Sequence, residues 1–139
     1  MALTRQSPTA IFEAHAAEAR AAVASAQTDE ARTHLDHAVS AHLTAGRLHN
    51  HGIKAAATAD RYRGIAAAAR GKRQFDVADA YDKLAAEYSA AETFAAERAQ
   101  SWHDRGGQHS TKARDADAPP VLEDDSAQTK TRSSLLRSK

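Results

Sequence analysis

Residues 77–102 read VADAYDKLAAEYSAAETFAAERAQSW, and this stretch decides the fold class. Its apolar side chains recur at alternating steps of four and three residues, the spacing that places them on one face of an α-helix. The row consists of Val77, Tyr81, Leu84, Tyr88, Ala91 and Ala95, and Trp102 extends it if the helix continues that far. The pattern predicts a long amphipathic helix that ends at Gly106-Gly107, because glycine disfavours a helix interior.

Two earlier segments show the same period. Ser7 and Pro8 predict the start of a first helix. Its apolar row is Phe12, Ala16, Ala19, Val23 and Ala26. Thr28, followed by two acidic residues, predicts the N-cap of a second helix over residues 29–50. The row of the second helix is Ala31, Leu35, Ala38, His42, Ala45 and His49.

A hairpin is expected in the middle of the chain. Asn50-His51-Gly52 would stop the second helix, and a third would run from there to Gly71. A turn near residues 71–75 would make this third helix antiparallel to the long one. Charge favours the pairing, since residues 76–97 hold six acids against one lysine, whereas 61–73 hold no acid. The basic residues of 61–73 are Arg61, Arg63, Arg70, Lys72 and Arg73.

Composition agrees with helices packed around a thin core. Of 139 residues 35 are alanine, while Ile, Leu, Val and Phe together number 18. Alanine is the best helix former, and a formal net charge of +1 is too small for the usual disordered composition. We therefore expect an all-α fold, either an antiparallel bundle or stacked hairpins of three to four alanine-rich helices, over residues 8–105. Residues 106–139 are expected to be a flexible, disordered tail with a basic C-terminus.

Several function classes lack support. The chain has no cysteine, which excludes a disulfide scaffold and a cysteine-based zinc site. It contains no membrane-span pattern, no P-loop and no G-x-S-x-G nucleophile motif. We therefore expect neither an enzyme nor a cofactor. The first ten residues have no secretory apolar run, so a cytoplasmic location is expected.

Eight histidines are a high number for this length. Glu30, His34 and His37 share one helical face and are candidate ligands for zinc or a similar cation. The same spacing is typical of a solvated polar face, so we assign no metal from the sequence. His42 and His49 are interpreted as edge histidines with wet tips, or else as a pH-sensitive interface. His51, in a turn, and His109, in the tail, have no evident partner.

A resemblance covers residues 52–96. Gly71, Phe75-Asp76, Ala78, Tyr81 and Ala85 are similar to the turn and second helix of a tetratricopeptide repeat. Gly52 with Ala57 is a fainter match to the same turn. The resemblance implies stacked helical hairpins with a surface that binds a peptide or a subunit.

The function predicted from these observations is a small helical interaction module, such as an adaptor, scaffold or assembly factor. A thin core buries little apolar surface, so a partner helix or a second copy of the chain would add much to its stability. The residues expected to make the richest contacts are Tyr81, Leu84, Tyr88, Phe94 and Trp102. Two alternatives stay open: a regulator that binds nucleic acid through residues 61–73 and the basic C-terminus, and a metal- or pH-responsive helical protein. A docking role is also considered for residues 131–139.

Overall fold

A computed structural model of the chain describes residues 7–119. It contains three α-helices, α1 (Ala10–Ser25), α2 (Asp29–Gly71) and α3 (Phe75–Asp117), and no strand within the described residues. The predicted all-α fold of alanine-rich helices is thus confirmed, with three helices. Residues 120–139, which include the proposed docking segment, lie outside the described residues.

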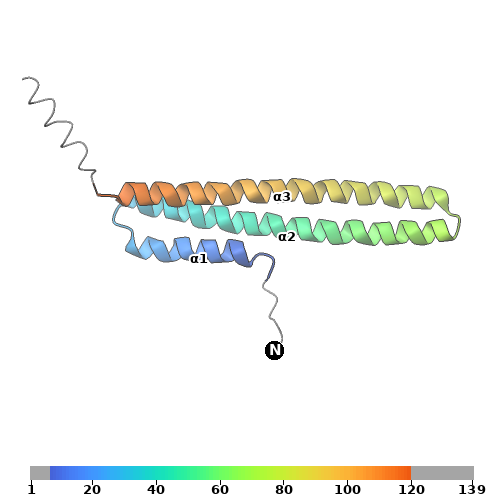
Figure 1. Ribbon diagram of the computed structural model, residues 1–139, viewed down its shortest axis with the longest axis horizontal. Helices are drawn as coiled ribbons and strands as arrows, with labels where there is room; N and C mark the ends of the chain where they lie inside the picture. The colour runs from blue at the N-terminus through green and yellow to red at the C-terminus, as the bar shows by residue number, and fades with distance from the viewer. Residues whose placement is uncertain (1–6, 120–139) are drawn as a thin grey trace, which may run out of the picture.

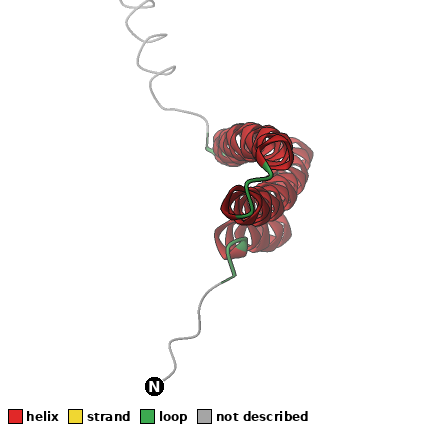
Figure 2. Ribbon diagram, turned by 90° about the vertical axis from the view of Figure 1, so that its right-hand side faces the viewer, coloured by secondary structure: helices red, strands yellow, loops and turns green. Residues whose placement is uncertain are grey.

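The helices form one elongated hairpin with a short third helix beside it. α2 and α3 have 43 residues each and lie side by side, antiparallel, along their whole length, about 65 Å (Figure 1). α1 has 16 residues and packs on α2 near the start of that helix. Viewed from the α2–α3 turn, α2 lies between α1 and α3 (Figure 2). We call the end with the α2–α3 turn the tip and the opposite end the base.

Small residues set the distance between α2 and α3. Each helix has a buried small residue at almost every seventh position, and we call these series the small-residue rows. In α2 the row is Ala31, Ala38, Ala45, Gly52, Ala59 and Ala66; in α3 it is Ala78, Ala85, Ala99, Gly106 and Ala113. A seven-residue repeat is the pattern of a coiled coil. With only methyl groups or hydrogens in the contact, side chains do not hold the two backbones apart, which is the condition for close helix packing.

The predicted helix stop at Asn50-His51-Gly52 is wrong, because α2 continues through it. Gly52 belongs to the small-residue row and faces α3. A Cβ placed on it would lie 3.4 Å from the Cβ of Ala95. Glycine disfavours a helix by about 1 kcal/mol relative to alanine, and packing along a 43-residue helix outweighs that preference.

The predicted end at Gly106-Gly107, and with it the domain boundary at residue 105, is also wrong. α3 continues to Asp117. Gly106 is buried and faces the ring of His42, so the absence of a side chain there serves packing. The side chain of Asp117 then accepts hydrogen bonds from the loop between α1 and α2. The helical part therefore includes residues that were expected to belong to the tail.

Local signals at the other ends agree with the structure more closely. The Thr28 Oγ1 accepts a hydrogen bond of 3.0 Å from the N–H of Ala31, which confirms this residue as the N-cap of α2. α1 begins at Ala10, two residues after the predicted start at Pro8. The α2–α3 turn occupies residues 72–74 as expected, with Arg73 at a φ of 60°.

Candidate functional site

The α2–α3 hairpin has two long edges, which differ in what covers them. One edge carries residues four positions after the small-residue rows and faces α1 in the half nearer the base; we call it the groove edge. The other carries residues three positions after the rows, and we call it the uncovered edge. Groove-edge residues include Leu35, His42, Arg63, Arg70, Asp82, Ser89 and His103. Uncovered-edge residues include His34, Tyr62, Tyr81, Tyr88, Trp102 and His109.

Near the tip, the uncovered edge is apolar. The ring of Tyr62 lies 5.7 Å from that of Tyr81 and 5.5 Å from that of Tyr88, between centroids. Tyr81 packs against the buried alanines of both helices. Leu84 is 38% exposed and Tyr88 37%. Together these side chains form what we call the apolar stripe: Tyr62, Ile65, Val77, Tyr81, Leu84 and Tyr88.

The larger side chains of α3 therefore flank the helix contact and do not fill it. Alanines occupy the centre, because two backbones this close leave no room for Leu or Tyr. The expectation that Val77, Leu84 and Tyr88 lie on the buried face is wrong, because these side chains are partly exposed beside the helix contact. Of the other residues expected to make rich contacts, Trp102 is half-buried beneath the guanidinium of Arg105, at 4.8 Å. Phe94 is 60% exposed and lies away from the stripe.

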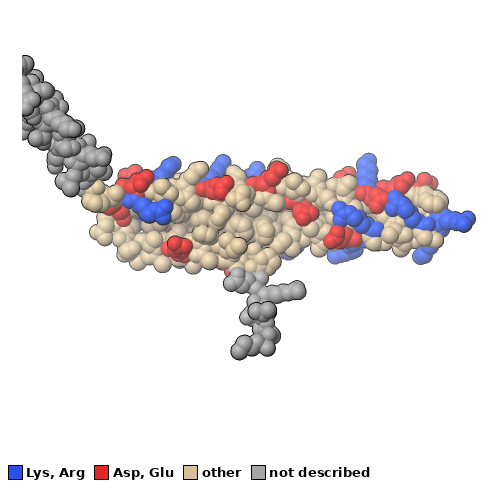
Figure 3. Space-filling view, in the orientation of Figure 1, with Lys and Arg blue, Asp and Glu red and all other residues tan. Residues whose placement is uncertain are grey.

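Charge is concentrated toward the tip (Figure 3). The guanidinium of Arg70 pairs with Asp82 and, at 3.5 Å, with Asp79, so the predicted attraction between the two helices exists at this point. Arg63 pairs instead with Asp60 of its own helix, at 2.8 Å. Among the described residues, no acidic side chain lies within ion-pair distance of Arg61, Lys72 or Arg73. These three exposed cations are available to a partner.

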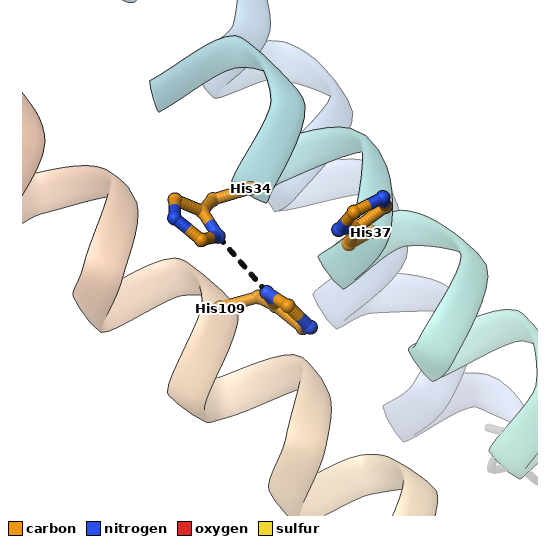
Figure 4. A group of neighbouring side chains, drawn as sticks. All are labelled: His34, His37 and His109. Atoms are coloured by element: carbon orange, nitrogen blue, oxygen red, sulfur yellow. Dashed lines mark hydrogen bonds between the residues drawn. The ribbon is translucent and has the colours of Figure 1, made fainter. Parts of the chain in front are cut away.

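At the base, the uncovered edge carries three histidines in contact (Figure 4). His34 and His37 come from α2 and His109 from α3, and each offers a ring nitrogen within 4.8 Å of the other two. The Nδ1 atoms of His34 and His109 lie 3.1 Å apart. Burial, and then the neighbouring His37 and His34, lower the pKa of His109. We call these three residues the edge cluster.

The edge cluster contains two of the three candidate ligands named from the sequence. His34 and His37 lie together as their spacing predicts, whereas the Glu30 carboxylate stands outside, 3.9 Å from the Nε2 of His34. His109, which is expected in the tail, belongs instead to α3 and completes the cluster. It comes three residues after Gly106, as His34 comes three after Ala31, so the small-residue rows are the sequence signal that places both on the same edge.

A second group of three histidines, one from each helix, lies where α1 meets the groove edge, and we call it the groove cluster. His15 of α1 stacks on His42 of α2 with ring centroids 5.2 Å apart, and the Nδ1 of His42 lies 3.0 Å from that of His103 of α3. The three line an open groove of about 520 Å³ together with Glu18 and Asp104.

His42 is only 3% exposed, so its interpretation as an edge histidine with a wet tip is wrong. Burial lowers its pKa, the charges of His103 and His15 lower it further, and Glu18 opposes them. A buried imidazole with a lowered pKa resists protonation at the pH where an ordinary histidine gains a proton.

The chain matches no protein-family description, and no similar curated protein or solved structure was found. The resemblance of residues 52–96 to a tetratricopeptide hairpin thus stays a prediction. Within residues 7–119, no helix combines the length and apolar character that a membrane crossing needs.

Proposed function

We propose that this chain is a non-catalytic helical interaction module that pairs with a second copy of itself through the apolar stripe. The observation that carries the proposal is the half-exposed row of tyrosines and aliphatic side chains on the uncovered edge near the tip, which α1 does not reach. The hairpin core consists mostly of alanines, which bury little area each. Covering the stripe would add apolar burial worth roughly 25 cal/mol per Å².

Charge favours one arrangement of the two copies. If α2 lies on α3 of the second copy, the exposed cations Arg61, Lys72 and Arg73 approach the acidic residues of 76–97. If α2 lies on α2, like charges meet instead, which disfavours that arrangement. The first arrangement has two-fold symmetry, so the same patch serves both copies, as in most homodimers.

Two matched substitutions test the proposal by sedimentation velocity. Leu84→Lys places a charge in the stripe, and Phe94→Lys places the same charge on a more exposed apolar residue of the same helix outside it. We expect Leu84→Lys to sediment as a monomer and Phe94→Lys to keep the association of the parent chain. Equal association of both variants would overturn the assignment of the stripe.

The nucleic-acid alternative makes a different prediction. It would place phosphates on Arg61, Lys72 and Arg73, since Arg70 is already paired with two aspartates. Such binding weakens steeply as salt increases, whereas pairing through apolar side chains does not. A protein partner other than a second copy would use the same stripe and leave the isolated chain monomeric. A cytoplasmic location stays a prediction.

A further inference from the structure

We propose that the edge cluster, His34, His37 and His109, binds a divalent transition-metal ion of the zinc class. Zn–N bonds are about 2.0–2.1 Å long, so two nitrogens on one tetrahedral ion lie about 3.3 Å apart. The Nδ1 atoms of His34 and His109 are 3.1 Å apart, and all three ligand nitrogens lie within 4.8 Å of one another. Side-chain rotation must therefore shorten the longest of these nitrogen–nitrogen distances by about 1.5 Å at most.

The ligands come from two helices whose spacing is fixed. His34 and His37 are one helical turn apart on α2, and His109 faces them from α3 (Figure 4). Beside them, the small-residue rows hold the two backbones close, with Ala31 and Ala38 fully buried. An ion at this point therefore joins α2 to α3. His34 and His37 alone lie on one helix and would not link the two.

The protonation of the cluster suits a metal. Two Nδ1 atoms at 3.1 Å can share only one proton, so at least one of His34 and His109 presents a lone pair to the other. Neutral imidazole is the form that binds metal.

Glu30 has a role beside the ion. When His34 binds through Nδ1, its Nε2 keeps a proton, and the Glu30 carboxylate lies 3.9 Å from that nitrogen. A carboxylate next to the free N–H of a ligating histidine orients the ring and strengthens the ligand. Its negative charge also offsets Lys112, a cation near His109. Glu30 is therefore a positioning residue and His34 a ligand.

The ligand set indicates the class of metal. Three imidazoles suit Zn²⁺, Co²⁺, Ni²⁺ or Cu²⁺, whereas Mg²⁺ and Ca²⁺ require oxygen ligands. Three protein ligands leave a fourth tetrahedral position, and His37 is exposed, so that position is open to water or to a group from another molecule. Metal binding at the base does not depend on pairing at the tip, and a monomer that binds Zn²⁺ would leave this inference intact.

The test is a titration of the full chain with Zn²⁺ and with Co²⁺ at pH 7.5. We expect one ion per chain, a visible absorption band from bound Co²⁺, and a rise in Tm with Zn²⁺. His37→Ala and His109→Gln should each weaken affinity at least tenfold, and Glu30→Gln by up to about tenfold. His37 is exposed, so its loss leaves the fold intact even if His109→Gln does not.

His51→Ala is the matched control, since His51 is an exposed histidine of the same helix outside both clusters. Its affinity should equal that of the parent chain. His15→Ala removes a residue of the groove cluster and should also leave affinity unchanged. The inference is overturned if the parent chain shows no heat of binding, no Co²⁺ absorption band and no change in Tm with either ion. It is also overturned if His37→Ala binds Zn²⁺ as tightly as His51→Ala.

Discussion

Gly106 of α3 leaves the space that the ring of His42 on α2 occupies. A Cβ at position 106 would lie 2.5 Å from the Cε1 of His42, closer than any real contact of this kind. The neighbouring Gly107 has nothing within 4 Å of such a Cβ. One glycine therefore admits a buried imidazole between two helices, while the next one only lowers helix propensity.

The two glycines should respond in opposite ways to alanine. We expect Gly107→Ala to raise the free energy of unfolding by about 1 kcal/mol through helix propensity. Gly106→Ala should lower it by about 1–3 kcal/mol, because the added methyl group overpacks against His42. Urea denaturation of both variants measures these changes in the free energy of unfolding. Equal stabilisation by both substitutions would show that His42 does not hold the position described.

The small-residue rows predict a sharp contrast between two adjacent alanines near the tip. Ala66 is fully buried against α3, and Ala67 is exposed. Ala66→Leu should destabilise the chain by about 1–3 kcal/mol or more, because the helices must move apart to admit the side chain. Ala67→Leu should change stability by no more than about 0.5 kcal/mol. Similar values for the two would contradict close packing along the rows.

The buried His42 predicts a loss of stability on acidification. Its pKa in the folded chain lies below the usual value of 6.5. As pH falls below about 6.5, the unfolded chain takes up a proton that the folded chain does not, so the free energy of unfolding decreases until the lowered pKa is reached. His15 and Glu18 of α1, and His103 and Asp104 of α3, face the same groove.

Thermal unfolding between pH 7.5 and pH 5.5 measures this effect. We expect Tm to fall across the range, and we expect His42→Gln to show a smaller fall than the parent chain. His51→Gln, which replaces an exposed histidine, should keep the full pH dependence. If Tm falls as steeply with pH in His42→Gln as in the parent chain, groups other than His42 cause the loss of stability.

Asp117 predicts a link between the end of α3 and the loop before α2. Its carboxylate accepts hydrogen bonds from the N–H of Gln27 (2.8 Å), and from the N–H (3.0 Å) and Oγ1 (2.8 Å) of Thr28. The Gln27 N–H and the two Thr28 donors lower its pKa. The stability it adds is therefore present above the unfolded value of 3.8 and is lost as pH falls through the lowered pKa.

Asp117→Ala should accordingly lower Tm at neutral pH and speed hydrogen exchange at the N–H groups of Gln27 and Thr28. The exposed Asp115 makes no side-chain contact of this kind within the described residues, so Asp115→Ala serves as the control. Equal exchange in the two variants would show that the contact does not order the loop.

The helix periods could be read from the sequence because they are local. Ala31, Leu35, Ala38 and Ala45 are buried as their spacing predicts, and Thr28 caps their helix. The helix ends at Gly52 and Gly106 could not be judged from local preference, because both glycines lie where the partner helix comes close. The recurrence of small residues every seven positions, continuing to Ala113, was the signal that both helices extend further.

Of the candidate metal ligands, two could likewise be predicted from local spacing and one could not. His34 and His37 share a helix turn, so their proximity follows from spacing alone. His109 joins them only because α3 continues past Gly106-Gly107 and runs antiparallel to α2. A contact between residues 75 positions apart depends on the register of the hairpin, and that register is set by packing of the small-residue rows.

The most direct test of the central claim is the solution mass of the parent chain, measured by light scattering on a sizing column at neutral pH and moderate salt. Pairing through the apolar stripe predicts a discrete species of twice the chain mass, which persists as salt is raised. A monomer at every concentration examined would contradict the claim and direct attention to a different protein as the partner of the stripe.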